Sequence, residues 1–211
     1  MSADTQTVLG PNDAASQHAF AHPDHIAADS AVLEFLLADA MSIASTSADE
    51  PTTVHIPTTE SWHRRTQLPE PARLVEVEKV TIVGFFGRLG DNIDPNVARA
   101  VQEVSEELAE SVFSVPGLLV YSSHQLADER NFANLVVVDS DAVVECWRSR
   151  NLHIAAATDL APAYYEHVRI YNGTAEPKPG KRPRIDLTAI KYWDYRCDPT
   201  WRAMRRFETT A

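Results

Sequence analysis

A histidine in the second half of the chain lies in a pattern that suits proton transfer. His153 follows Trp147 by six residues, within a segment from about residue 142 to 157 whose periodicity predicts a helix. At 100° per residue, His153 shares a stripe with Ser149 and Arg150, and small and polar residues suit a helix edge that lines a pocket. A neutral imidazole there can act as a general base, or its nitrogen can ligate haem iron. A helix-end histidine bonded to a backbone carbonyl is the alternative.

Further ionisable residues follow the predicted strands. His124 ends a strand expected from Leu118 and can face the same pocket as His153, although an exposed hairpin end is the simpler interpretation. A strand expected over residues 164–171 has one mainly apolar face and one aromatic and ionisable face, the latter formed by Tyr165, His167, Arg169 and Tyr171. That face can bind an anionic or phenolic ligand with Arg169 as its charge partner, or form a structural network within a dimer.

Metal, thiol and nucleotide chemistry have less support. His18, His22 and His25 have a spacing that can hold zinc, but no fourth ligand is evident, so we do not expect a metal site there. Cys146 has only Arg150 as an activating neighbour, which argues against a nucleophile. With seven glycines and no Gly-rich phosphate loop, a nucleotide-cofactor domain is not expected either.

Composition limits the partners of the chain. The 211 residues carry a formal net charge of -11, which argues against nucleic acid because phosphate binding needs basic surface. No apolar run reaches the roughly 18 to 20 residues of a membrane span, and no secretory signal is evident. Two cysteines do not make a disulfide framework. We therefore expect an acidic, cytoplasmic protein with no membrane and no nucleic-acid partner.

The first third of the chain is expected to be an extension. Residues 1–28 lack periodic apolar residues and are predicted to be disordered or loosely packed. Asp29 can cap a helix that runs to about Ile43, with an apolar stripe that includes Leu33 and Leu37. The Pro-rich segment 44–72 opposes regular structure. We thus treat residues 1–73 as a partly disordered extension with one helix.

The middle of the chain predicts a ferredoxin-like α+β domain over residues 74–175. Asp94 and Pro95 mark a helix start, and Pro116-Gly117 marks its end. The expected elements follow the order β-α-β-β-α-β, with strands over 74–86, 118–124, 132–138 and 164–171 and helices over 95–112 and 142–157.

The last segment, residues 176–211, carries 9 basic and 5 acidic residues. We predict a fifth strand over 184–193 and a short helix over 201–207, with the basic tail docked on an acidic body. Two helices on one face of the sheet would leave its second face bare, although the strands are apolar on both faces. Pairing with another copy, sheet against sheet, would cover that face and predicts a homodimer.

Three segments carry a resemblance to a known family: Pro116-Gly117-Leu118-Leu119, the hairpin 128–138, and the run from Trp147 to Ala156. Over residues 76–174 the chain resembles the dimeric α+β barrel superfamily, and most of all the antibiotic biosynthesis monooxygenase and haem-degrading monooxygenase-like domains. That resemblance implies a small domain that acts on a small molecule. Haem-degrading members carry an Asn on the first strand and a Trp at the end of the third, and this chain has Phe85-Phe86 and Val138-Asp139 there. Haem breakdown is therefore not expected, whereas haem binding through His153 stays open.

The resemblance and the residues together favour a monooxygenase-type oxidoreductase of secondary metabolism. Its substrate would be aromatic or polycyclic, bound between sheet and helices without a cofactor, with His153 and His124 as catalytic residues. Substrate contacts would come from Trp147, Phe86, Arg169, Tyr165 and His167. One alternative is a haem b enzyme with His153 as axial ligand, and another is a non-enzymatic dimer that binds a small molecule or a partner.

Overall fold

All strands of the chain join one mixed sheet in a computed structural model that describes residues 6–47, 50–59, 62–178 and 180–208, with the side chains of 56–63 left out. The sheet has the strand order β1-β9-β8-β7-β4-β6-β5-β3-β2. Its described strands are β1 (Thr7–Leu9), β2 (Thr52–Thr59), β3 (Trp62–Leu68), β4 (Val80–Leu89), β5 (Leu118–Gln125), β6 (Asn131–Val138), β7 (Tyr165–Ala175), β8 (Ile185–Asp194) and β9 (Trp201–Arg206).

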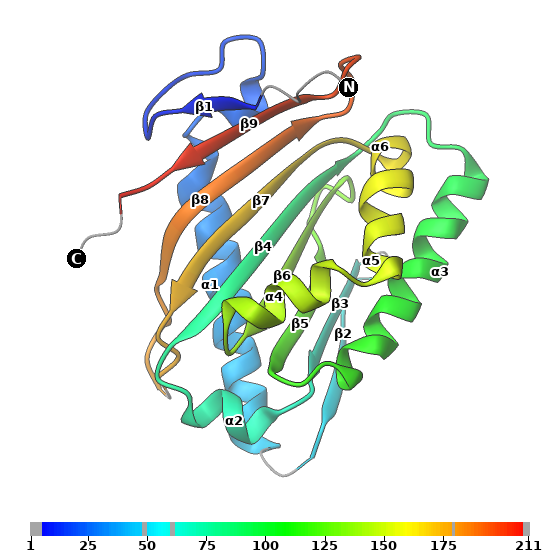
Figure 1. The fold of residues 1–211 in the computed structure, drawn as a ribbon. Coiled ribbons are helices and arrows are strands. Elements are labelled where there is room, and N and C mark those ends of the chain that lie inside the picture. The colour runs from blue at the N-terminus through cyan, green and yellow to red at the C-terminus, as the bar shows by residue number, and fades with distance from the viewer. Residues whose placement is uncertain (1–5, 48–49, 60–61, 179, 209–211) are drawn as a thin grey trace.

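The centre of the sheet is the predicted ferredoxin-like α+β domain. Its four strands lie in the order β7-β4-β6-β5, and every pair among them is antiparallel. The helix α3 (Pro95–Ser111) connects β4 to β5, and Asp94 caps it by accepting a hydrogen bond from the Asn96 N–H at 2.7 Å, as predicted. The helices α4 (Asp141–Arg148), α5 (Asn151–Ala155) and α6 (Ala161–Tyr164) connect β6 to β7. Figure 1 shows α3 to α6 together on one face of the sheet, called here the helix side.

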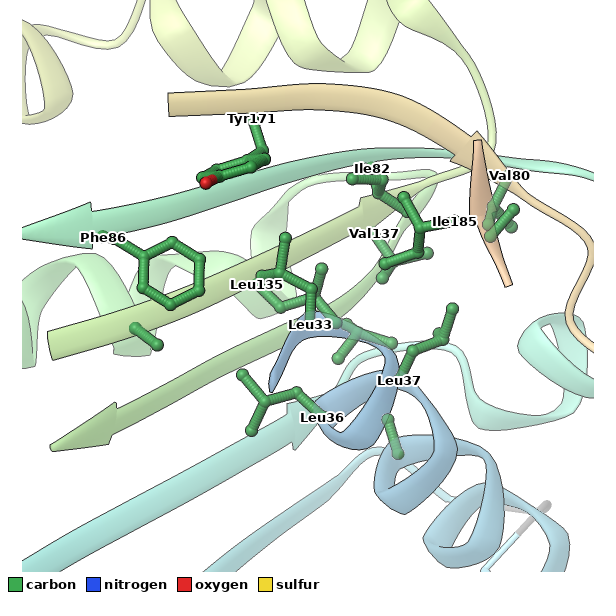
Figure 2. Packing of buried hydrophobic residues seen from close by; sticks show 14 of the residues in the cluster. Leu33, Leu36, Leu37, Val80, Ile82, Phe86, Leu135, Val137, Tyr171 and Ile185 are labelled. Carbon is green, nitrogen blue, oxygen red and sulfur yellow. The ribbon is translucent and has the colours of Figure 1, made fainter. Parts of the chain in front are cut away.

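The second face of the sheet is covered by the chain itself. The helix α1 (His25–Thr46) crosses behind β4, β6 and β7 in Figure 1. Leu33, Leu36 and Leu37 of α1 are fully buried and pack against residues such as Ile82 and Leu135 of the sheet (Figure 2). Their transfer out of water stabilises this layer by about 1.5 to 3 kcal/mol per side chain. The bare face on which the homodimer prediction rested is thus occupied by α1.

Two predictions for the ends of the chain are wrong and a third is wrong in part. Residues 1–5 lie outside the described residues, and residues 6–28 include β1 and a 3-10 turn (Ala19–Ala21) but are mostly exposed. The described part of segment 44–72 includes β2, β3 and the start of α2 (Pro71–Glu76). The tail 201–207 forms β9 instead of the predicted helix. Burial alternates along it, since Ala203 and Arg205 are buried and their neighbours are not, and this period of two is that of a strand. The predicted domain boundaries at residues 73 and 175 stay a prediction. Strands from before, between and after these two positions belong to the same sheet.

The predicted helix over 142–157 is interrupted. Arg150 has an extended backbone with ψ 134° between α4 and α5, and a π-helical turn (Ala156–Leu160) follows α5. Among the described residues, no helix is both long enough and apolar enough to cross a bilayer.

Candidate functional site

The residues predicted to form one site divide between the two faces of the sheet. His153, Trp147 and Tyr165 lie on the helix side. The other four residues lie on the opposite face, which α1 covers and which is called here the α1 side: Phe86, His124, His167 and Arg169. The structure therefore provides two candidate sites.

On the helix side, His153 contacts an aromatic pair. Its ring lies edge-on to Trp147 at 6.1 Å, and Trp147 lies 6.0 Å from Tyr121 of β5. The guanidinium of Arg150 lies over the Trp147 ring at 6.0 Å and donates hydrogen bonds to the Ser111 carbonyl and the Ser114 hydroxyl at the end of α3. These contacts fix the bend between α4 and α5 and place His153 beside Trp147.

The environment of His153 keeps its imidazole neutral. Burial, helped by the charge of Arg148, lowers the pKa of His153 below its ordinary value. The segment that carries it is only partly buried: neither α5 nor the π-helical turn contains a fully buried residue, although Leu152 and Ala156 pack against the cluster around Trp147. π-helical turns within helices are frequent at functional sites. The helix side thus presents a proton acceptor on a partly buried segment.

Tyr165 faces the helix side because of an irregularity in the sheet. The register between β4 and β7 shifts between Arg88 and Leu89, which places one extra residue in β7. Tyr165 consequently lies against Phe85, at 5.4 Å between ring centroids, while His167 points to the opposite face. The alternation that grouped Tyr165 with His167 and Arg169 is wrong at this one position.

On the α1 side, one row across the sheet joins four of its strands. His124, Ala133, Phe86 and Arg169 are successive partners in the register from β5 to β7. The Arg169 guanidinium lies over the Phe86 ring at 5.6 Å. Phe86 therefore cannot shape a pocket together with Trp147, and His124 and His153 cannot shuttle a proton between them, because the sheet separates each pair.

A buried network of charged and polar groups surrounds Arg169. Its Nε and Nη2 donate to the two carboxylate oxygens of Asp29 at 2.7 and 3.2 Å. The Tyr171 hydroxyl donates to Asp29 at 2.5 Å, so its oxygen must accept the 2.8 Å hydrogen bond from His25 Nδ1. Burial is the main reason that the pKa of His25 falls to about 3, with Arg169 lowering it further. His25 is thus a neutral imidazole protonated at Nδ1.

Asp29 and His25 were missed as site residues. Asp29 was expected to cap the helix, but α1 begins four residues earlier and Asp29 is buried inside it. The signal was present in the sequence: Asp29 and Leu33 are four residues apart and share one face of a helix, and His25 continues that row. A carboxylate on an apolar stripe implies a buried partner, and Arg169 is that partner.

A cavity of about 460 Å³ opens beside this network. Its walls include Ala19 and Phe20 of the N-terminal segment, His25 of α1 and Arg169 of β7. Phe20 also stacks on His167 at 4.2 Å, and burial lowers the pKa of His167 to about 4. Burial and the charge of Arg64 lower the pKa of His124 on the same face. The ionisable face of β7 thus carries an internal ion pair between Arg169 and Asp29, and the N-terminal segment forms part of the cavity wall beside it.

Haem does not fit this arrangement well. Its iron would need His153 at the wall of a large apolar cavity, and the cavity described above lies on the other face of the sheet and is not lined by His153. His153 instead lies against Trp147.

Comparison with known proteins gives similar structures only. No family model matches the sequence, and no curated protein matches it. SnoaB of Streptomyces nogalater, a cofactor-independent oxygenase, is 16% identical over 50% of this chain and 100% of that chain, with a TM-score of 0.37. A structure named antibiotic biosynthesis monooxygenase is 14% identical over 46% of this chain and 99% of that chain, with a TM-score of 0.38. Rv0793 of Mycobacterium tuberculosis is 12% identical over 47% of this chain and 94% of that chain, with a TM-score of 0.37. The solved structures similar to this chain thus include proteins of the family that its motifs resemble.

Proposed function

We propose that the chain is a cofactor-free oxidoreductase that oxidises a phenolic aromatic molecule on the helix side, with His153 as the general base. The observation that carries this proposal is a neutral, partly buried imidazole placed edge-on to Trp147, on a segment without fully buried residues. The sequence resemblance to antibiotic biosynthesis monooxygenases supplies the reaction class.

His153 suits a base better than His25 and His167 of the other face. A general base works best when its pKa is near the working pH. Burial lowers the pKa of His25 to about 3 and that of His167 to about 4, which makes both weak bases at neutral pH. Burial and the charge of Arg148 also lower the pKa of His153, which leaves its imidazole neutral and able to accept a proton. Because Trp147 is buried, the substrate's ring would reach it only after α5 is displaced.

The proposed reaction balances without a bound cofactor. His153 takes the phenolic proton, and the resulting phenolate has carbanion character at a ring carbon. That carbon transfers one electron to dioxygen, and the radical pair combines to a peroxide anion. The anion takes the proton back from the His153 imidazolium and becomes a hydroperoxide. Loss of water from the hydroperoxide leaves a quinone, so one oxygen atom enters the product and the other leaves as water.

Oxygen uptake tests this proposal. Purified protein is mixed with a panel of phenols and hydroxylated polycyclic aromatics in an oxygen electrode, together with His153→Ala and the exposed-histidine control His55→Ala. We expect uptake with at least one substrate, a loss of about 10²-fold or more in His153→Ala, and no change in His55→Ala. Equal rates in all three proteins would contradict the role of His153. An absorption spectrum recorded with one equivalent of haem tests the alternative: a Soret band lost in His153→Ala would favour the haem enzyme.

The cavity on the α1 side favours a second candidate function, the binding of a small aromatic acid. Phe20 supplies a ring for stacking and the neutral His25 a polar wall, while the guanidinium of Arg169, which is paired with Asp29, also lines the cavity. Calorimetric titration with 4-hydroxybenzoate tests this binding. We expect saturable binding that weakens in Phe20→Ala, whereas Phe113→Ala, a change at an exposed phenylalanine of another segment, should not alter it. Equal affinity in both variants would reject this site.

A further inference from the structure

Three side chains from separate segments meet at one end of the sheet. Asp194 is the last residue of β8, Cys197 lies in the turn after it, and His18 comes from the N-terminal segment. His18 Nδ1 lies 3.0 Å from Asp194 Oδ2, and one possible ligand atom of each of the three residues lies within 4.8 Å of the other two. The other two histidines of the spacing considered for zinc have different partners: His22 pairs with Asp24, and His25 with Tyr171.

The packing around this cluster holds its ligands in place. Asp194 is 2% exposed, and the His18 side chain is 13% exposed. The His18 ring stacks on Trp201 at 3.7 Å with an interplanar angle of 11°, and its edge contacts Phe20. The ring orientation is therefore fixed before any ligand arrives, which reduces the entropy that binding must overcome.

We propose that His18, Asp194 and Cys197 bind a zinc ion. A nitrogen, a carboxylate oxygen and a thiolate are all ligands that zinc accepts. In a tetrahedral zinc site, with bonds of about 2.0 to 2.3 Å, neighbouring ligand atoms are roughly 3.3 to 3.7 Å apart. The His18–Asp194 pair, now at 3.0 Å, would therefore widen slightly, and separations that approach 4.8 Å would shorten. Three protein ligands leave the fourth position open to water or to an added ligand.

Arg196 competes with the metal in the unloaded protein. Its Nε donates to Asp194 Oδ1 at 2.9 Å and its Nη2 to Oδ2 at 2.8 Å, so the carboxylate is already neutralised. The Arg196 side chain is 53% exposed and can move into solvent when a dication arrives. Metal binding should therefore release this guanidinium, and removing its charge should tighten binding.

This zinc site is independent of the proposed oxidation. It lies on the α1 side of the sheet, with His18 and Phe20 near His167, whereas His153 lies on the helix side. Its ligands join the N-terminal segment to the turn between β8 and β9. A bound metal would thus tie the segment that closes the α1-side cavity to the edge of the sheet.

Cobalt(II) titration of the untagged, full-length protein tests the proposal. We expect one equivalent of cobalt to give the visible bands of a four-coordinate ion and a near-ultraviolet thiolate-to-cobalt band, both abolished by zinc. Cys197→Ser should lose the thiolate band and weaken binding by at least about tenfold. Cys146→Ser, at the exposed second cysteine, should retain both.

Two further variants make the test specific. His18→Ala should weaken cobalt binding, and His22→Ala should not, while circular dichroism checks that each variant is folded. Arg196→Gln should tighten binding relative to the unchanged protein. The proposal is overturned if the unchanged protein binds no cobalt, if the thiolate band survives in Cys197→Ser, or if it disappears in Cys146→Ser.

Discussion

His25 is the first residue of α1, and its imidazole is held uncharged inside the protein. Burial, with Arg169 and Arg205 nearby, lowers its pKa from 6.5 to about 3. In the unfolded chain the same imidazole takes up a proton as the pH falls below 6.5, so the unfolded state binds more protons between pH 6.5 and 3. Its contribution to stability is complete above pH 6.5 and is lost progressively as the pH falls toward 3.

We expect the free energy of unfolding to fall by roughly 2 to 3 kcal/mol between pH 6.5 and 4.5 because of this one group. Urea unfolding at several pH values measures the change. His25→Asn keeps an N–H donor near the position of Nδ1 but does not titrate, so its stability should depend less on pH. The exposed His55→Asn serves as the control. An equal pH dependence in both variants would reject this explanation.

Arg205 is a second residue whose role depends on complete burial. Its side chain donates to the carbonyls of Gly10, Asp13 and Ala21 and to the Tyr192 hydroxyl. A lysine cannot reach these four acceptors at once, because it lacks the planar fork of the guanidinium. Arg205→Lys should therefore cost about 2 to 4 kcal/mol of stability and expose residues 10–21 to limited proteolysis. Arg206→Lys, at an exposed neighbour, should change neither; a normal protease pattern in Arg205→Lys would contradict the anchoring role.

At the scale of elements, the contact between α1 and β4 depends on a glycine. A Cβ atom placed on Gly84 would lie 2.5 Å from Cδ1 of Leu33, so any side chain there pushes α1 away from the sheet. Gly84→Ala should destabilise the protein by about 1 to 3 kcal/mol. Leu33→Ala alone should also destabilise, by about 2 to 5 kcal/mol, because it leaves a cavity. The double variant should be more stable than the sum of the two single losses predicts. Thermal unfolding of the unchanged protein, the two single variants and the double variant measures this difference. If the two losses in stability simply add, the contact between Gly84 and Leu33 is not tight.

The elements that could be predicted from the sequence are those with local signals. Asp94 and Pro95 start α3 as expected, and Pro116-Gly117 precedes β5. The strands β3 and β9 were missed because their buried faces carry polar residues. Arg64 is 8% exposed and pairs with Asp39 of α1, and Arg205 is fully buried. A pattern based on hydrophobicity counts such arginines as surface residues, so the alternation that defines a strand disappears from the sequence.

The candidate sites were predictable in part for the same reason. Arg169 and His167 share a strand face by alternation, which the structure retains. Their partners Asp29 and Phe20 are about 140 residues away in the chain, and no local pattern pairs segments at that distance. The extra residue that turns Tyr165 to the helix side is likewise set by pairing between strands. The chemistry of single residues could thus be inferred, but their grouping into two sites could not.

At the scale of the whole molecule, α1 takes the place that a second copy would occupy in a sheet-on-sheet dimer. The residues that such a dimer would bury, including Ile82, Leu135, Val137 and Tyr171, are already covered by α1 (Figure 2). Dimerisation through this face would require α1 to leave, which exposes Leu33, Leu36 and Leu37 at a cost of several kcal/mol.

We therefore expect the intact chain to be a monomer in solution, with a mass near 23.4 kDa by light scattering at every concentration. Loosening α1 with Leu37→Asp should uncover the sheet face, because a carboxylate at this position cannot stay buried without a partner. That variant should associate as its concentration rises, whereas the exposed Phe35→Asp on the same helix should remain a monomer. If the unchanged protein has twice the monomer mass, hydrogen exchange in β4 and β6 shows whether this face of the sheet is the interface. Protection of these strands that increases with protein concentration would mean that α1 leaves the sheet, and it would overturn this account.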